Sequence, residues 1–259
     1  MAEVARIFTV EKRGVGLPDY AAPKPVGAVP IGPIYTSTDI AELAARLDSI
    51  NTFDRRGNVI WMDGFEDGIK RMSIVGDDAF GMSWDADYPF HGGYSLKLWT
   101  DAAAWKETYV SAHCPYPTLS KIGFEVAFRP DNKLSNLWLL TDMYDDTYRH
   151  RGAVIYTPET GVWTFYNAAG GFTALSPAVS IPINHFSIIK VVCDYTIDEY
   201  IRLIVNNTTF NLEGEGIRRT TDGAGPYLGS TVNIINGAAG ASTCYIDNMI
   251  LTQQEPPND

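Results

Sequence analysis

Carboxyl groups are the side chains of this sequence with the clearest catalytic potential. Hydrolysis of a glycosidic bond requires two of them, roughly 5–9.5 Å apart across the scissile bond. Asp85 and Asp87 stand two residues apart in the segment 84–87, but no third acid accompanies them, and the segment is expected to be a loop. Asp194 and Glu199 bound a second acidic stretch, which is more typical of a solvated hairpin turn. We therefore expect no enzymatic activity and assign no catalytic residue.

Aromatic side chains offer a different chemistry, because a tryptophan or tyrosine ring can stack on a sugar ring while nearby polar groups bind its hydroxyls. The candidates for carbohydrate binding lie in stretches expected to be loops: Trp84, Tyr88, His91 and Trp105. Trp138 and Trp163 could also line the face of a sheet. The alternative for each ring is a place in the core, where most aromatic residues of a domain this size lie.

An acidic cluster formed by Asp142, Asp145 and Asp146 stands close to Arg149 and Arg151. Clustered carboxylates can bind Ca²⁺, which takes about six to eight oxygen ligands. The neighbouring arginines compete for the same carboxylates, so the alternative is a loop of surface ion pairs.

The charge balance narrows the choice of partners. The 259 residues include 31 acidic and 20 basic side chains, which gives a formal net charge of −11. Phosphate backbones repel such a chain unless it carries a basic patch, and its lysines and arginines are scattered, so we exclude nucleic-acid binding. The apolar runs are too short for a membrane span, and the N-terminus lacks the hydrophobic core of a signal peptide. We expect a protein made in the cytoplasm.

The cysteines and histidines do not form a metal-binding pattern. Cys114, Cys193 and Cys244 are widely spaced, odd in number and without a C-x-x-C pair. The four histidines show neither H-x-H nor H-x-x-x-H spacing. Cys193 and Cys244 lie in apolar runs and are expected to be small buried side chains.

Residues 1–36 combine prolines with regularly recurring apolar residues. Proline fixes φ and cannot donate to a strand ladder, so an extended segment is expected. A solvated linker would be polar, whereas an apolar arm is suited to lie on another surface. Tyr20 and Tyr35 are candidate anchor residues within it.

Residues 37–50 show the pattern of one short helix. Asp39 is a favourable N-cap with Glu42 three residues later. The apolar residues that follow have the 3-4-3 spacing of a coiled-coil seam: Ile40, Leu43, Leu47 and Ile50. The helix could dock on its own domain, or it could gather subunits around an axis.

Residues 51–259 form a strand-rich body. In 121–130, Ile122, Phe124, Val126 and Phe128 face one way while Lys121, Glu125 and Arg129 face the other, which is the period of a half-buried strand. Strands are expected at twelve places: 58–65, 94–99, 108–112, 121–129, 137–144, 152–157, 162–167, 186–195, 200–206, 208–212, 231–236 and 244–252. This pattern predicts an all-β fold, an antiparallel two-sheet sandwich.

Four segments of the body resemble the concanavalin A-like and carbohydrate-binding-module jelly rolls. In order, they are WMDGFEDG at 61–68, GGYSLKL at 92–98, GFEVAFRP at 123–130, and RLIVNNTTFNLEG at 202–214 followed by YIDNMIL at 245–251. The resemblance implies a jelly-roll sandwich whose first and last strands pair. It also implies a structural calcium site near those strands, with Asp63, Glu66 and Asp247 as ligands; the alternative is that these acids cap strand ends.

The whole architecture resembles the virion accessory proteins of tailed phages, which are decoration, cement or fibre subunits with a lectin-like jelly roll behind an N-terminal anchor. The resemblance implies a non-enzymatic structural protein that forms a homo-oligomer, with a trimer favoured. It would dock on a larger assembly such as a capsid through residues 1–50 and lie on the virion surface or in a soluble assembly. The alternative is a carbohydrate-binding module or receptor-binding lectin with a glycan partner; a glycoside hydrolase is less favoured.

Overall fold

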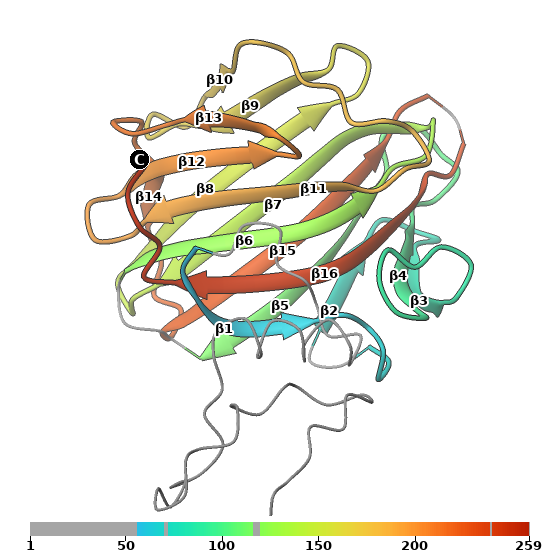
Figure 1. Cartoon of the computed structure of the whole chain (residues 1–259), viewed down its shortest axis with the longest axis horizontal. Helices are drawn as coiled ribbons and strands as arrows, with labels where there is room; N and C mark the ends of the chain where they lie inside the picture. Colours follow the sequence, from blue (N-terminus) through green and yellow to red (C-terminus); the bar gives the residue numbers. More distant parts are fainter. Residues whose placement is uncertain (1–55, 70–71, 116–119, 239, 259) are drawn as a thin grey trace, which may run out of the picture. The chain divides into compact units, whose positions relative to one another are not determined.

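The alternation of apolar and polar residues gives each strand one face for the core and one for the outside. The computed structural model describes residues 56–69, 72–115, 120–238 and 240–258. These residues form two antiparallel sheets packed face to face (Figure 1). The all-β, two-sheet sandwich expected from the sequence is therefore confirmed. The predicted arm (1–36) and helix (37–50), with their anchor candidates, lie outside the described residues.

Sheet A has eight strands, and sheet B has eight as well. In spatial order, sheet A contains β13 (Thr208–Asn211), β12 (Glu199–Val205), β11 (Ser187–Asp194), β6 (Lys121–Arg129), β16 (Thr243–Gln253), β4 (Ser95–Trp99) and β3 (Gly81–Asp85), with β1 (Asn58–Asp63) paired to β16. Sheet B contains β10 (Phe172–Ala174), β9 (Val162–Tyr166), β8 (Tyr148–Thr157), β7 (Leu134–Tyr144), β15 (Tyr227–Asn236), β5 (Glu107–Pro115) and β2 (Met72–Gly76), with β14 (Arg218–Thr221) paired to β8.

All twelve expected strands overlap strands of the structure. The pairing of the first strand with the last is also confirmed, since Asp63 of β1 lies opposite Met249 of β16. The short strands β2, β3, β10 and β14 were not expected. The prediction of a loop at Trp84 and Asp85 was wrong, because both residues belong to β3, which pairs with β4.

The core lies between the sheets and takes one face of each central strand. Leu139 of β7, Val232 of β15 and Val110 of β5 are fully buried there, opposite residues of β6 and β11 such as Phe124 and Val191. All three cysteines are buried as free thiols. Trp163 is also a core residue, with its indole Nε1 donating to Val179 O at 2.9 Å. Of the two positions considered for Trp163 from the sequence, the structure shows the one in the core.

The two sheets approach closely at Gly152 of β8. A Cβ atom there would lie 2.4 Å from Cys193 Sγ and 3.2 Å from Thr141 Oγ1, both buried. Overpacking of this kind costs about 1–3 kcal/mol, so we expect Gly152→Ala to lower the free energy of unfolding by that amount. Urea denaturation measures the change. Gly225→Ala is the control, because nothing lies within 4 Å of its Cβ position; an equal effect of both substitutions would contradict the close packing.

The described part of the chain contains no helix with the length and hydrophobicity needed to cross a bilayer. The outer faces of the two sheets carry polar and aromatic side chains, and on sheet B these side chains line a groove.

Candidate functional site

The aromatic residues expected to bind sugar do not share one site. Trp84 stacks on Tyr94, with ring centroids 3.7 Å apart, and its Nε1 donates to Phe65 O at 2.5 Å. Tyr88, in the loop after β3, lies edge-on to Tyr245 with the Arg129 guanidinium 3.8 Å from its ring centroid.

His91 follows in the same loop and donates its backbone N–H to Asp247 at 3.1 Å. Trp105 lies in the loop between β4 and β5 and is 67% exposed. It borders a shallow depression with Lys133, Glu159 and Gly237, to which the other three candidates do not contribute. Sugar binding by these four residues remains a prediction.

The three calcium candidates bind backbone amides. Asp247 accepts hydrogen bonds from the N–H groups of Phe90, His91 and Asn248. Glu66 accepts from Gly93 N at 3.0 Å and from Tyr94 N at 3.1 Å. Asp63 accepts from Phe65 N at 2.8 Å. No group of three or more acidic, histidine or cysteine side chains within the described ranges could hold a metal ion. The structure shows these acids fixing loops at strand ends, and their role as calcium ligands stays a prediction.

The buried carboxyl of Asp247 makes the stability of the sandwich depend on pH. Burial raises its pKa from 3.8 to about 6, against the lowering effect of the three amide hydrogen bonds. The folded state therefore holds the proton more tightly than the unfolded state, and this contribution to stability is lost as the pH rises from about 4 to about 6. Its size is about 2–3 kcal/mol at one pKa unit per 1.36 kcal/mol.

Denaturation at pH values between 4 and 6.5 tests this effect. We expect Asp247→Asn to lose less stability than the wild type as the pH rises through that window. Parallel pH profiles for the two proteins would contradict the raised pKa. Glu215→Gln, an exposed carboxylate, is the control and should follow the wild type.

A groove crosses the outer face of sheet B over β5, β15, β7 and β8. It encloses about 410 Å³. The groove residues face outward and alternate along their strands with residues that face the core. They are Glu107, Tyr109, Ser111, His113, Trp138, Leu140, Asp142, Tyr144, Arg151, Tyr227, Gly229, Thr231 and Asn233. We call this surface the groove. Because neighbouring strands are fixed by the sheet ladder, the groove is built on rigid elements.

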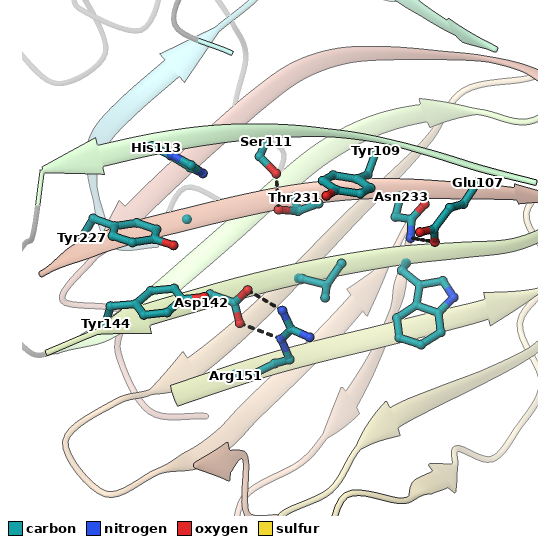
Figure 2. Close-up of a pocket in the computed structure, with 13 residues that line it drawn as sticks. Glu107, Tyr109, Ser111, His113, Asp142, Tyr144, Arg151, Tyr227, Thr231 and Asn233 are labelled. Carbon is teal, nitrogen blue, oxygen red and sulfur yellow. Dashed lines mark hydrogen bonds and ion pairs between the residues drawn. The ribbon is translucent and has the colours of Figure 1, made fainter. Parts of the chain in front are cut away.

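One end of the groove is aromatic. Tyr144 and Tyr227 are cross-strand partners and stack with ring centroids 4.3 Å apart and planes at 18°. The ring of His113 lies 5.0 Å from that of Tyr227, on the opposite side of β15 from Tyr144 (Figure 2). Burial and a hydrogen bond with Tyr227 raise the pKa of Tyr144, so its hydroxyl stays protonated.

Gly229 widens this end of the groove. It lies between His113 of β5 and Asp142 of β7 in the ladder. A Cβ at Gly229 would meet Tyr227 at 3.4 Å and nothing closer, which is an ordinary contact. A larger side chain would therefore fill open groove space without straining the backbone.

Asp142 holds two arginines at the β8 side of the groove. Its carboxylate accepts from Arg151 Nε at 2.7 Å and Nη2 at 2.8 Å, and from Arg149 Nε at 3.2 Å and Nη2 at 3.0 Å. Burial raises the pKa of Asp142 to about 6 even though Arg149 lowers it. The carboxylate is thus ionised at neutral pH. This arrangement is the ion-pair alternative considered for the acidic cluster.

The other end of the groove carries Glu107 and Asn233 (Figure 2), and Trp138 is the cross-strand partner of Asn233. Asn233 Nδ2 donates to Glu107 Oε2 at 3.1 Å, and the hydroxyls of Ser111 and Thr231 lie 2.6 Å apart in the middle. Trp138 Nε1 and Asn233 Oδ1 are buried atoms without a hydrogen-bond partner among the described residues.

Sequence reasoning named part of this surface and missed the rest. Trp138 was expected on a sheet face, and Asp142 and Arg151 in an ion-pair cluster. Tyr144, Tyr227 and the other groove residues were missed, although their positions alternate with mostly apolar residues in 107–113, 138–144 and 227–233. That alternation was the available signal, but it does not show which strands lie side by side.

No protein-family model matches the chain, and no curated protein matches it. Solved structures do. The chain is similar to an endo-β-1,4-glucuronan lyase from the fungus Trichoderma reesei, with a TM-score of 0.54, 10% identity and coverage of 76% of this chain and 96% of the lyase. It is also similar to the cellulose induced protein Cip1, with a TM-score of 0.50, 15% identity and coverage of 77% and 100%.

A sialidase is a third similar structure, with a TM-score of 0.51, 11% identity and coverage of 77% of this chain. This chain spans 19% of the length of the sialidase. At these identities the likeness shows the sandwich fold and nothing finer.

Proposed function

We propose that the sandwich is a carbohydrate-binding domain whose ligand lies in the groove on sheet B. The observation that carries this proposal is the combination of stacked Tyr144 and Tyr227 at one end with Trp138 and polar side chains at the other. A sugar presents apolar faces and a rim of hydroxyl groups, so a binding surface needs aromatic rings together with fixed donors and acceptors.

The groove is suited to a chain of sugars because of its extent and rigidity. It crosses four strands of one sheet, so its residues keep their spacing without a ligand. Glu107, Ser111 and Thr231 line the groove and supply donors and acceptors for ligand hydroxyls. The named chemistry of the glucuronan lyase and of the sialidase is compatible with this proposal at a coarse level.

A binding screen of the full chain against polysaccharides and oligosaccharides tests the proposal. We expect saturable binding to at least one glycan, and we expect Gly229→Leu to reduce that binding because the new side chain fills the groove. Gly223→Leu is the matched control, since nothing lies within 4 Å of its Cβ position. Equal binding by all three proteins would place the ligand elsewhere, and the absence of binding across the screen would refute the function.

The same screen separates Trp138 in the groove from Trp105 in the loop between β4 and β5. We expect Trp138→Ala to weaken glycan binding and Trp105→Ala to leave it unchanged. The reverse result would restore the loop site expected from the sequence.

We further propose that the domain binds glycans without cleaving them. The sequence offers no pair of acids in a hydrolase pattern, and Asp142, the buried carboxylate of the groove, is engaged by two arginines. Prolonged incubation with the bound glycan should yield neither new reducing ends nor unsaturated products. If the wild type released either product and Tyr227→Phe did not, the domain would be an enzyme.

The hypothesis of a virion structural subunit gains no support from the similar structures described above. It rests on residues 1–50, which lie outside the described residues, and the trimer, the capsid partner and the virion location rest on them too. These remain predictions of the sequence. Light scattering of the full chain beside a chain beginning at Thr52 tests them, because an assembly device in 1–50 requires the first to be an oligomer and the second a monomer.

A further inference from the structure

Three arginines gather on the outer face of sheet B beside the groove. Arg149 and Arg151 lie on β8 and point away from the core, and Arg218 of β14 is the direct cross-strand partner of Arg151. Like charges placed opposite each other on one face destabilise a sheet. In a chain with a formal net charge of −11, such a cluster is unusual and calls for a compensating anion.

The carboxylates of this face compensate the cluster only in part. Asp142 contacts both Arg149 and Arg151, as described above. Asp222, just after β14, lies close enough to raise the pKa of Asp142, and its Oδ1 accepts from Ala224 N. Arg218 forms no ion pair among the described residues. Arg149 and Arg151 therefore share the one carboxylate of Asp142, and Arg218 adds a third positive charge at this end of the groove.

The guanidinium groups keep donors available for a ligand. Arg149 and Arg151 both bind Asp142 through Nε and Nη2, so Nη1 of each has no hydrogen bond to the described residues. The Arg149 Cζ lies 5.6 Å from the ring centroid of Tyr144, and the Arg218 Cζ lies 5.5 Å from that of Tyr166. Guanidinium groups held by carboxylates and rings are ordered in advance, which favours recognition of groups with two or more anionic oxygens.

We propose that the groove selects anionic glycans, placing a carboxylate or sulfate group of the sugar against Arg151 and Arg218 while Tyr144 and Tyr227 contact a sugar ring. This inference rests on the proposed carbohydrate binding and adds the class of ligand. Carboxylate and sulfate share the chemistry that the cluster recognises, which is two or more anionic oxygens that accept from guanidinium N–H groups.

Isothermal titration calorimetry of the full chain tests the selectivity with three oligosaccharides of equal length: a neutral one, one of uronic acid residues and a sulfated one. We expect at least one anionic glycan to bind about tenfold or more tightly than the neutral one, as for a charge-assisted hydrogen bond. We also expect that added salt weakens the anionic ligand more than the neutral one. The preference between the uronate and the sulfate identifies the anion.

Three matched variants locate the effect. Arg218→Gln should lower the affinity for the anionic glycan about tenfold and leave neutral glycan binding unchanged. Arg151 lines the groove itself, so Arg151→Gln should lower the affinity for the anionic glycan by a larger factor than the affinity for the neutral one. Arg219→Gln removes the same charge from the same strand, but Arg219 lies over Tyr148 and contacts Asp198, so it should bind like the wild type. Arg218 does not contact Asp142, so its variant tests the proposal even if Arg151→Gln fails to fold.

Several results would overturn the inference. Equal affinity for neutral and anionic glycans would refute the selectivity and leave the proposed function intact. Equal losses of affinity for the anionic glycan in Arg219→Gln and Arg218→Gln would show that overall charge, and not the cluster, causes the selectivity. Binding of polyphosphate as tightly as the anionic glycan would show the same. Absence of binding to every glycan would refute the proposed function together with the inference.

Discussion

Replacement of Glu255 by Gln is expected to lower the free energy of unfolding by about 3–5 kcal/mol, the range found when one partner of a buried ion pair is removed. Glu255 follows β16 and is 2% exposed. Its Oε1 lies 2.7 Å from Lys190 Nζ, and its Oε2 contacts Arg202 Nη2. Lys190 and Arg202 are themselves buried on the outer face of β11 and β12. The substitution therefore removes the carboxylate that both buried cations contact.

Neighbouring hydrogen bonds add to this effect. Thr252 Oγ1 donates to Glu255 Oε1, and Arg202 Nη1 donates to Pro256 O at 2.9 Å. The cluster thus fixes the segment after β16 on sheet A. Urea denaturation at pH 7 measures the change, with Glu215→Gln as an exposed control. A loss below about 1 kcal/mol, typical of a surface ion pair, would show that water reaches the cluster.

Replacement of Tyr227 by Ala is expected to weaken glycan binding by about 10–100-fold, as for a well-packed aromatic anchor of a binding surface. Tyr227 lies between the rings of Tyr144 and His113, so its loss removes the ring that links both neighbours. Tyr227→Phe keeps the stacking and should retain most of the affinity. Calorimetric titration with the glycan identified in the screen measures both variants.

Tyr88→Ala is the control for this prediction. Tyr88 is an exposed tyrosine at 44%, lies outside the groove and was expected from the sequence to bind sugar. Unchanged glycan binding in Tyr88→Ala together with weaker glycan binding in Tyr227→Ala would support the groove as the binding site. Loss in Tyr88→Ala with unchanged binding in Tyr227→Ala would move the site to the loop after β3.

The sandwich could be predicted from the sequence because burial dictates a period of two. Ile122, Phe124, Val126 and Phe128 all point into the core from β6, and the charged residues Lys121, Glu125 and Arg129 alternate with them on the other face. Short edge strands carry less of this signal. In β3, Gly81 and Ser83 break the apolar pattern, and Trp84 stacks on Tyr94 at the sheet edge, so a loop was expected there.

The groove could not be predicted because its residues come from four strands that are distant in sequence. Asp142 of β7 and His113 of β5 both lie beside Gly229 of β15 only because of the ladder register. Polar and aromatic residues at every second position of a strand identify its outer face. Which of these side chains meet is decided by the pairing of β15 with β5 on one side and β7 on the other. The arginine cluster depends likewise on the pairing of β14 with β8.

The location of a bound glycan tests the central claim most directly. A crystal structure of the full chain with the oligosaccharide that it retains in the screen should show a sugar ring against Tyr144 and Tyr227 and polar contacts toward Asn233. A ligand seated on Trp105, or on Trp84 and Tyr88, with the groove filled only by water would contradict the assignment of the binding site to sheet B.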